Sequence, residues 1–343
     1  MEVFIMKRYA FYILAFVSVF ISMASISLAT PDTWTRKADM PTGRAGLSSC
    51  VVNSKIYAIG GYSEKFPEGV LGFVEEYDPA TDTWTKKTDM PTKRAWFGAC
   101  VVNDKIYCIG GWHPGGIYAI VEEYNPTTDT WAKKTDMPTS RECPATSVVK
   151  GRIYAIGGAG GSMSEVEEYD PVTDKWTKKS NMPTPRNDAS AVTVNEKIYV
   201  IGGGVLKGAT WPALSVVEEY DPVTDKWIRK ADMTSARYCA TVAVNRRIYA
   251  IGGCTDFFIG SMGISTFEEY NPVKDEWTIK PNIPTARADL SACVVNGKIY
   301  AIGGWSSVFN PNAFTTIEEY DTRLSSVDAK GKLTTSWGKI KNK

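Results

Sequence analysis

A single histidine, His113, occurs among the 343 residues, and this scarcity excludes several kinds of site. A Ser-His-Asp arrangement needs a serine beside its histidine, and nothing in the sequence marks such a serine. No Cys-x-x-Cys pair or Cys/His cluster supplies the ligands of a zinc site. We therefore expect no metal and no cofactor, and the sequence identifies no catalytic residue.

An excess of charge of one sign is also lacking, because 39 Lys and Arg residues face 38 Asp and Glu residues. This balance gives no field that would attract nucleic acid or an acidic membrane surface. The composition, with 43% hydrophobic and 22% charged residues, is typical of one globular body. We expect a monomer that does not bind nucleic acid.

Long hydrophobic runs are absent except for residues 9–28, which follow Lys7-Arg8 and lead into Ser27-Leu28-Ala29, a small-x-small cleavage pattern. This order predicts an export signal over residues 1–29. The run is also long enough to span a bilayer as an uncleaved anchor, and this alternative stays open. We expect a secreted or periplasmic protein that does not insert into the membrane once the signal is cleaved.

The rest of the chain repeats one pattern about every 50 residues. The segment Val294–Gly304 shows it: two apolar runs flank Asn-Gly, the pair typical of a tight hairpin turn, and Gly-Gly then ends the second run. After a variable stretch come Glu-Glu-Tyr and, in most copies, a tryptophan. The tyrosines are Tyr77, Tyr124, Tyr169, Tyr220, Tyr270 and Tyr320, and the tryptophans are Trp84, Trp131, Trp176, Trp227 and Trp277.

An arginine opens each unit, at Arg44, Arg94, Arg141, Arg186, Arg237 and Arg287. Arginine, paired glycine, tyrosine and tryptophan in this order resemble the kelch repeat. The resemblance implies an all-β, six-bladed β-propeller with four-stranded antiparallel blades over residues 30–324, followed by a tail over 325–343. The arginines could line an anion site, but we favour charge-assisted hydrogen bonds to backbone or to the repeated glutamates.

Trp34 predicts how the ring closes. Residues 31–40 copy the outer-strand segment 81–90, yet they precede the first hairpin. We expect this N-terminal strand to complete the sixth blade beside residues 317–320. The alternative is that residues 333–339, with Trp337 at a similar place, supply that strand.

Seven cysteines leave at least one thiol without an internal partner. Most occupy equivalent positions of different units, which are too far apart for a disulfide. We expect buried thiols, and Cys100 with Cys108, across one hairpin, is the pair to check.

Residues that occur once, on the face that carries the loops after Gly-Gly and around each arginine, are the candidates for a site. The antiparallel order of the first two strands brings these loops to one face. Aromatic residues of this kind serve as anchors in interfaces and suit stacking on sugars, and carboxylates beside the channel could do acid/base work. The predicted ligand-binding residues are Tyr62, Trp96, Trp112, His113, Glu142, Asn187, Asp188, Trp211, Tyr238, Phe257, Asp289 and Trp305.

Kelch propellers are mostly recognition platforms, so the resemblance implies a binding module for a protein or a glycan. Among exported members, the bacterial sialic acid mutarotase is similar in size and blade number. An isomerase of that kind is therefore the alternative, with Glu142, Asp188, Asp289 and the repeated arginines as candidates for its chemistry. Fold similarity alone does not choose between them.

Overall fold

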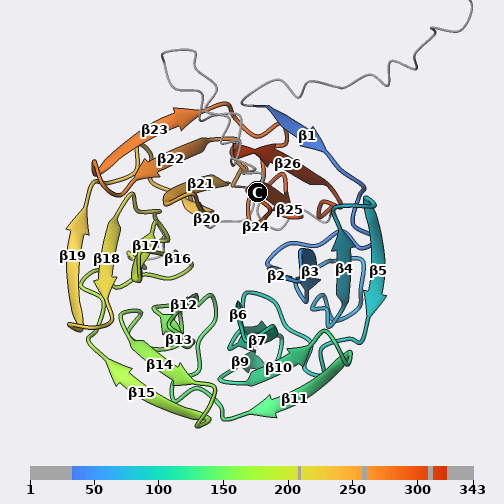
Figure 1. The fold of residues 1–343 in the computed structure, drawn as a ribbon, viewed down its shortest axis with the longest axis horizontal. Helices are drawn as coiled ribbons and strands as arrows, with labels where there is room; N and C mark the ends of the chain where they lie inside the picture. Colours follow the sequence, from blue (N-terminus) through green and yellow to red (C-terminus); the bar gives the residue numbers. More distant parts are fainter. Residues whose placement is uncertain (1–32, 208–209, 257–260, 308–311, 323–343) are drawn as a thin grey trace, which may run out of the picture. The chain divides into compact units, whose positions relative to one another are not determined.

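The computed structural model describes residues 33–207, 210–256, 261–307 and 312–322. Within these ranges the chain forms six four-stranded antiparallel sheets and one two-stranded hairpin. The six sheets stand around a central axis as blades (Figure 1), which confirms the predicted propeller. The predicted signal, residues 1–29, and the tail, residues 325–343, lie outside the described residues.

Each blade runs from an inner strand beside the axis to an outer strand at the rim (Figure 1). Blade 1 contains β2 (Ser48–Val52), β3 (Lys55–Ile59), β4 (Val74–Asp78) and β5 (Thr83–Lys87). Blade 2 contains β6 (Gly98–Val102), β7 (Lys105–Ile109), β10 (Val121–Asn125) and β11 (Thr130–Lys134). A separate hairpin of β8 (Trp112–His113) and β9 (Gly116–Ile117) lies in the chain between β7 and β10. Blade 3 contains β12 (Ala145–Val149), β13 (Arg152–Ile156), β14 (Val166–Asp170) and β15 (Lys175–Lys179).

The remaining blades follow the same order. Blade 4 contains β16 (Ser190–Val194), β17 (Lys197–Ile201), β18 (Val217–Asp221) and β19 (Lys226–Lys230). Blade 5 contains β20 (Tyr238–Val244), β21 (Arg247–Cys254), β22 (Phe267–Asn271) and β23 (Glu276–Lys280). Blade 6 contains β24 (Ser291–Val295), β25 (Lys298–Ile302), β26 (Ile317–Asp321) and, from the other end of the chain, β1 (Trp34–Arg36).

The inner hairpins have the tight turns that the sequence predicts. Asn296 and Gly297 have φ angles of 51° and 77°, and Asn53 and Ser54 have φ angles of 50° and 61°. Two successive positive φ angles define the primed turn whose twist matches that of the flanking strands. The six copies of this hairpin place β2, β6, β12, β16, β20 and β24 around the channel.

The N-terminal strand closes the ring, as predicted. Trp34 in β1 pairs with Tyr320 in β26, and Arg36 pairs with Glu318. The competing segment, residues 333–339, lies outside the described residues, and β1 occupies the edge of β26 that it would need. The first and last parts of the propeller are therefore held together by one sheet, visible as the adjacent blue and red strands in Figure 1.

The repeated tyrosine and tryptophan pack between blades. Tyr77 lies 5.0 Å from Trp84 and 6.3 Å from Tyr300 of the neighbouring blade, measured between ring centroids. Trp84 Nε1 donates to the carbonyl of Ala38 at 3.0 Å. Asp82 accepts from both the Tyr77 hydroxyl, at 2.5 Å, and the Ala38 amide, at 2.8 Å. Each blade is thus tied to its neighbour by aromatic burial and by directed hydrogen bonds.

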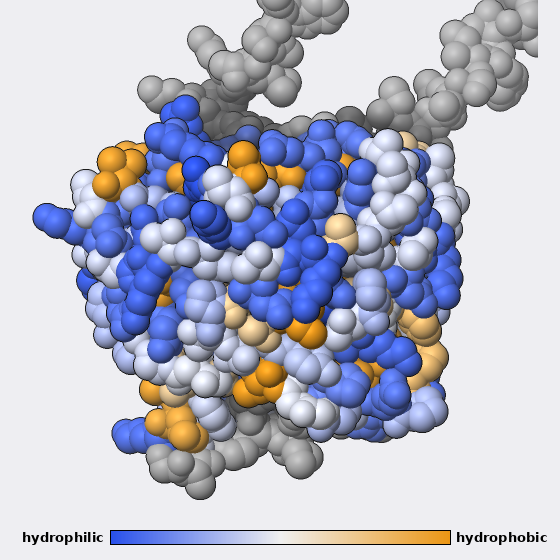
Figure 2. All heavy atoms as spheres, turned by 90° about the horizontal axis from the view of Figure 1, so that it is seen from below, coloured by the Kyte–Doolittle hydropathy of each residue, from blue (hydrophilic) through white to orange (hydrophobic). Residues whose placement is uncertain are grey.

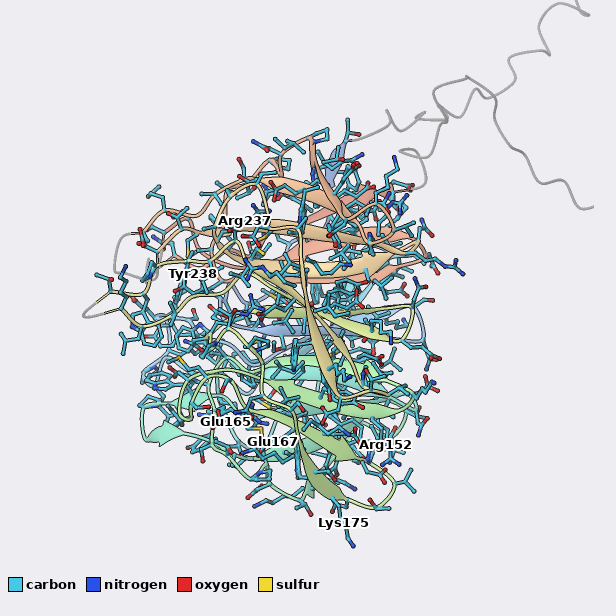
Figure 3. The ribbon with its side chains drawn as sticks, turned by 90° about the vertical axis from the view of Figure 1, so that its left-hand side faces the viewer. Arg152, Glu165, Glu167, Lys175, Arg237 and Tyr238 are labelled. Carbon is cyan, nitrogen blue, oxygen red and sulfur yellow. The ribbon has the colours of Figure 1, made fainter. Side chains whose placement is uncertain are left out.

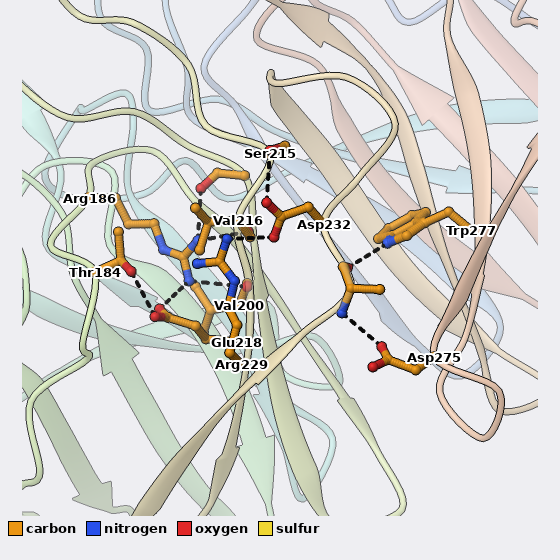
Figure 4. A network of polar contacts seen from close by, with 12 residues as sticks. Thr184, Arg186, Val200, Ser215, Val216, Glu218, Arg229, Asp232, Asp275 and Trp277 are labelled. Carbon is orange, nitrogen blue, oxygen red and sulfur yellow. Dashed lines mark hydrogen bonds and ion pairs between the residues drawn. The ribbon is translucent and has the colours of Figure 1, made fainter.

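The repeated arginines are structural. Arg186 is fully buried, and its guanidinium donates to Glu218 at 2.7 Å and to the carbonyl of Val216 at 2.8 Å (Figure 4). Thr184 donates to the second oxygen of Glu218 at 2.7 Å. All six arginines are 0% exposed, and each pairs with the first glutamate of its own Glu-Glu-Tyr segment. The hypothesis that they line an anion site is therefore wrong.

All seven cysteines are free, and all except the partly exposed Cys143 are buried. Cys100 pairs with Tyr107, whereas Cys108 pairs with Ala99. The two thiols therefore point to opposite faces of the sheet, since side chains alternate along a strand. The expectation of unpaired thiols is confirmed.

The two faces of the ring differ in content. In the side view of Figure 3, Tyr238 and Glu165 lie toward one face, and Arg152 and Lys175 lie toward the other. We call the first, which carries the segments after Gly-Gly, the loop face. The side of the rim seen in Figure 2 is mainly hydrophilic, with hydrophobic residues scattered in small groups. Among the described residues, none belongs to a helix that could cross a bilayer.

Candidate binding site

A cavity of about 280 Å³ opens at the centre of the ring, where the six arginine loops meet the inner strands. The second residue after each arginine lines the cavity, and the residue type at this position varies among the blades. These residues are Gly46, Trp96, Cys143, Asp188, Cys239 and Asp289. We call the space the channel cavity. Hydroxyl-bearing residues of the inner strands also line it, namely Ser48, Ser49, Thr146, Ser190, Thr241 and Ser291.

Backbone conformation makes these positions unusual. Trp96 has a φ angle of 52°, Cys143 of 49°, Asp188 of 52° and Asp289 of 49°. Residues with a Cβ atom seldom adopt this left-handed conformation, which costs roughly 1 to 2 kcal/mol for each residue. Such strain gathers where the surrounding structure over-determines a position, often at ligand sites. The side chains are held over the cavity at a cost to the fold.

Hydrogen bonds link four of the loops into one rim. The Gly46 amide donates to the carbonyl of Asp289 at 3.0 Å, and the Trp96 amide donates to the carbonyl of Gly46 at 2.9 Å. The Cys143 amide then donates to the carbonyl of Trp96 at 2.6 Å. This chain of bonds connects blades 6, 1, 2 and 3 and fixes the position of Trp96.

Four aromatic side chains gather on the blade 6, 1 and 2 side. The Trp96 ring lies 5.7 Å from Tyr62, 5.5 Å from Trp112 and 6.3 Å from Trp305, measured between ring centroids. We call these four the aromatic cluster. Trp305 is only 1% exposed, so it supports the others from within and offers no surface to a ligand. Of the four, Trp96 lines the channel cavity.

Two carboxyl groups also line the cavity, those of Asp188 and Asp289, whereas Glu142 does not belong to its lining. Burial and then the charge of Glu142 raise the pKa of Asp188 to about 6, against a hydrogen bond from Cys143 that lowers it. Burial and then the charge of Asp188 raise the pKa of Asp289 to about 8, against a hydrogen bond from Trp96 that lowers it. Burial also raises the pKa of Glu142. Trp96 Nε1 donates a hydrogen bond to Asp289 Oδ2 at 3.3 Å, which connects the aromatic cluster to this carboxyl group.

Other predicted residues have local structural contacts. Tyr238 is 5% exposed, and its hydroxyl donates to the carbonyl of Trp211 at 2.7 Å, so it anchors the loop that carries the half-buried Trp211. The Asn187 side chain accepts from the Ala159 amide at 3.0 Å. These residues position neighbouring loops, and they do not line the channel cavity.

His113 also lies apart from the cavity lining. His113 Nδ1 accepts from the Gly115 amide at 3.0 Å, and its ring stacks on Tyr118 at 5.8 Å between centroids. This pattern belongs to a turn residue. Phe257 lies outside the described residues.

Cys143, like Cys239, is a lining residue that the sequence pattern does not reveal, because its thiol is indistinguishable from the buried cysteines. Its spacing of two residues from Arg141 is the same as that of Asp188 from Arg186, and this equivalence is the signal that could have found it. Among the described residues, no group of three His, Cys, Asp or Glu side chains could hold a metal ion.

Comparison with known proteins agrees with the repeats. The family model described as the KLHDC2/KLHL20/DRC7 Kelch-repeats domain matches residues 25–203 and 159–304, and the Kelch motif matches residues 286–326. No curated protein matches the chain. A solved structure titled "Structure of YjhT" is similar in fold, with a TM-score of 0.70 and 18% identity over 82% of this chain and 95% of that chain. The family matches cover most of the propeller, and the chain belongs to the kelch-repeat family.

Proposed function

We propose that the protein is an extracytoplasmic binding module that recognises a glycan at the channel cavity on its loop face. Export is supported by the charged, apolar and small-residue order of residues 7–29. The kelch propeller fold supports a binding module. The choice of a glycan over a protein surface rests on the shape and chemistry of the cavity.

The observation that carries the proposal is the position of Trp96. Its ring lines the cavity, and its indole nitrogen contacts Asp289 in the same space. A flat apolar ring beside carboxylate acceptors matches a sugar, which has an apolar ring face and hydroxyl donors at its edge. The volume of about 280 Å³ is near the lower end of small-molecule sites, roughly 300 to 1,000 Å³, and is too small for a broad protein epitope.

A glycan array with residues 30–343, the mature protein expected after cleavage, tests the proposal. Hits should weaken at least about tenfold in Trp96→Ala, because the stacking surface is lost. Phe66→Ala is the matched control, since Phe66 lies in a neighbouring loop, packs on Phe73 and does not line the channel cavity. Silence on the array, or equal loss in both variants, would contradict glycan binding in the cavity and direct the search to protein partners.

The alternative function is a sugar isomerase of the mutarotase type. It is supported by Asp188 and Asp289, whose raised pKa values of about 6 and about 8 suit proton exchange near neutral pH. Anomer exchange needs one group to take the proton of the anomeric hydroxyl and another to protonate the ring oxygen. The repeated arginines cannot assist, because all six are buried in ion pairs.

NMR of anomer exchange on any sugar that binds separates the two functions. An isomerase would accelerate exchange and lose that acceleration in Asp188→Asn. A binding module would leave the exchange rate of the free sugar unchanged.

A further inference from the structure

The channel cavity is negatively charged on one side and has no compensating cation. Among the described residues that line it, two are aspartates and none is lysine, arginine or histidine. Glu142 lies close enough for its charge to act on Asp188. Arg186 and Arg287, two residues before the aspartates, form ion pairs with the buried glutamates Glu218 and Glu318. An anionic ligand would therefore find no cationic partner among the described residues that line the cavity.

Asp188 and Asp289 also act on each other. The charge of Asp188 raises the pKa of Asp289, so the two are reluctant to ionise together. A positive charge in the cavity would remove this repulsion and take the place of the proton that the pair retains. Asp289 accepts a hydrogen bond from Trp96 Nε1 through Oδ2. Its Oδ1 has no hydrogen-bond partner among the described residues and can contact a ligand.

The acidic side chains alone would not define a ligand, but the enclosed volume and the Trp96 ring narrow the choice. An aromatic face within about 6 Å of a cation attracts it through the ring quadrupole. A bare divalent metal is a poor fit, because the described residues offer no group of three ligands for it. An organic cation with an apolar body satisfies both sides of the cavity.

We infer that the group bound in the channel cavity is a protonated amine carried by an amino sugar, with Asp188 and Asp289 as its carboxylate partners beside the Trp96 ring. The inference rests on the proposed glycan-binding function and names its ligand class. It separates this protein from a module for acidic sugars, since sialic acids carry the wrong charge.

Ligand-observed NMR titration of the purified protein tests the inference with three probes. These are glucosamine, its neutral counterpart N-acetylglucosamine, and N-acetylneuraminic acid. Glucosamine should bind at least about tenfold more tightly than N-acetylglucosamine, which is the ratio that one charge-assisted hydrogen bond supports. N-acetylneuraminic acid should not bind.

Variants locate the effect. Asp289→Asn and Asp188→Asn keep the side-chain shape and should abolish the preference for the amine while N-acetylglucosamine still binds, which also shows that the variants are folded. Asp136→Asn is the matched control, because Asp136 is an exposed acid that pairs with Lys133 at 3.4 Å. It should keep the full preference.

The possible failures are distinguishable. Equal binding of the amine and the N-acetyl sugar, lost in Trp96→Ala, would overturn the amine inference and leave glycan binding intact. Binding of N-acetylneuraminic acid would overturn it in favour of an acidic ligand. No binding of any of the three sugars would overturn the amine inference, whereas the glycan array separately decides whether the protein binds a glycan.

Discussion

Arg287 and Asp289 lie two residues apart in one loop, and they differ in burial, in their partners and in how often they recur among the blades. Arg287 is fully buried, donates to Glu318 at 2.7 Å and has an equivalent in all six blades. Asp289 lines the channel cavity, has a positive φ angle and shares its identity with only one equivalent, Asp188. The repeated position holds each blade together, whereas the position two residues later is free to vary because its side chain faces the channel. Fold and candidate function are thus separated within a single loop.

The largest expected effect comes from breaking a repeated position. Arg186→Ala would leave the buried carboxylate of Glu218 without its partner, and we expect a loss of about 3 to 5 kcal/mol in unfolding free energy. Chemical denaturation measures it. The control is Arg229→Ala in the same blade, whose exposed pair with Asp232 is worth about 1 kcal/mol or less (Figure 4). Equal losses in the two variants would contradict a structural role for the repeated arginine.

Ring closure should show the next largest effect. Trp34→Ala removes ring contacts with Phe267 at 5.1 Å and Tyr320 at 5.3 Å, and a hydrogen bond to the carbonyl of Pro281 at 3.2 Å. Because Trp34 is only partly buried, we expect a loss of about 2 to 3 kcal/mol, below that of a core tryptophan. Trp34→Phe keeps the packing and should lose about 1 kcal/mol for the hydrogen bond. Unchanged unfolding of Trp34→Ala would show that β1 contributes little to closure.

The variable position should instead affect pH dependence. Folding raises the pKa of Asp289 from 3.8 to about 8, so its protonated form stabilises the fold below about pH 4 and this stability is lost as the pH rises through 8. Asp188 and Trp96 act directly on the pKa of Asp289. The charge of Asp289 in turn raises the pKa of the Cys143 and Cys254 thiols. Glu142 acts on Asp289 indirectly, because its charge raises the pKa of Asp188. Asp289→Asn should therefore be more stable than the parent at pH 9, and the difference should grow as the pH rises from 4 through 8.

Thermal unfolding of parent and Asp289→Asn between pH 4 and pH 9 measures this difference. The difference cancels the opposite trend of carboxylates such as Asp82, whose pKa is lowered chiefly by its hydrogen bond from Tyr77. Parallel stability curves for the two proteins would contradict the raised pKa. Asp136→Asn provides an exposed control.

The smallest expected effect concerns backbone strain. Cys143 has a φ angle of 49°, which glycine adopts without penalty. Cys143→Gly should therefore be more stable than Cys143→Ala by about 1 kcal/mol, because both lose the thiol and only glycine relieves the strain. Equal stability of the two variants would show that the loop relaxes around this residue.

The sequence predicts the repeated part of the molecule well, because the same residues recur at equivalent positions of the six units and make equivalent contacts. Trp34 identifies the closing strand for this reason, since its segment matches five others. The variable loops offer no such check. Tyr238 and Trp305 look like surface rings in the sequence, but Tyr238 bonds to the loop at Trp211 and Trp305 packs beneath Trp96.

The candidate site is predicted in part. Asp188 and Asp289 are recognisable as singular residues after an arginine, yet their meeting in one cavity depends on the position of each blade around the ring. Cys143 gives no signal apart from its equivalence to them. Contacts between loops of different blades have no period, so local pattern cannot supply them.

The pairing of β1 with β26 has a consequence for the order of folding. Trp34 lies in the first described strand of the propeller, but its partner strand β26 is the last to be synthesised of those described. Blades 1 to 5 consist of strands that are close in the chain and can form as the chain appears, whereas blade 6 must wait. Long-range pairing of this kind slows folding and leaves an open strand edge until it is completed. The exposed edge of β26 is therefore the point at which a chaperone, or a second copy of the chain, would compete with β1.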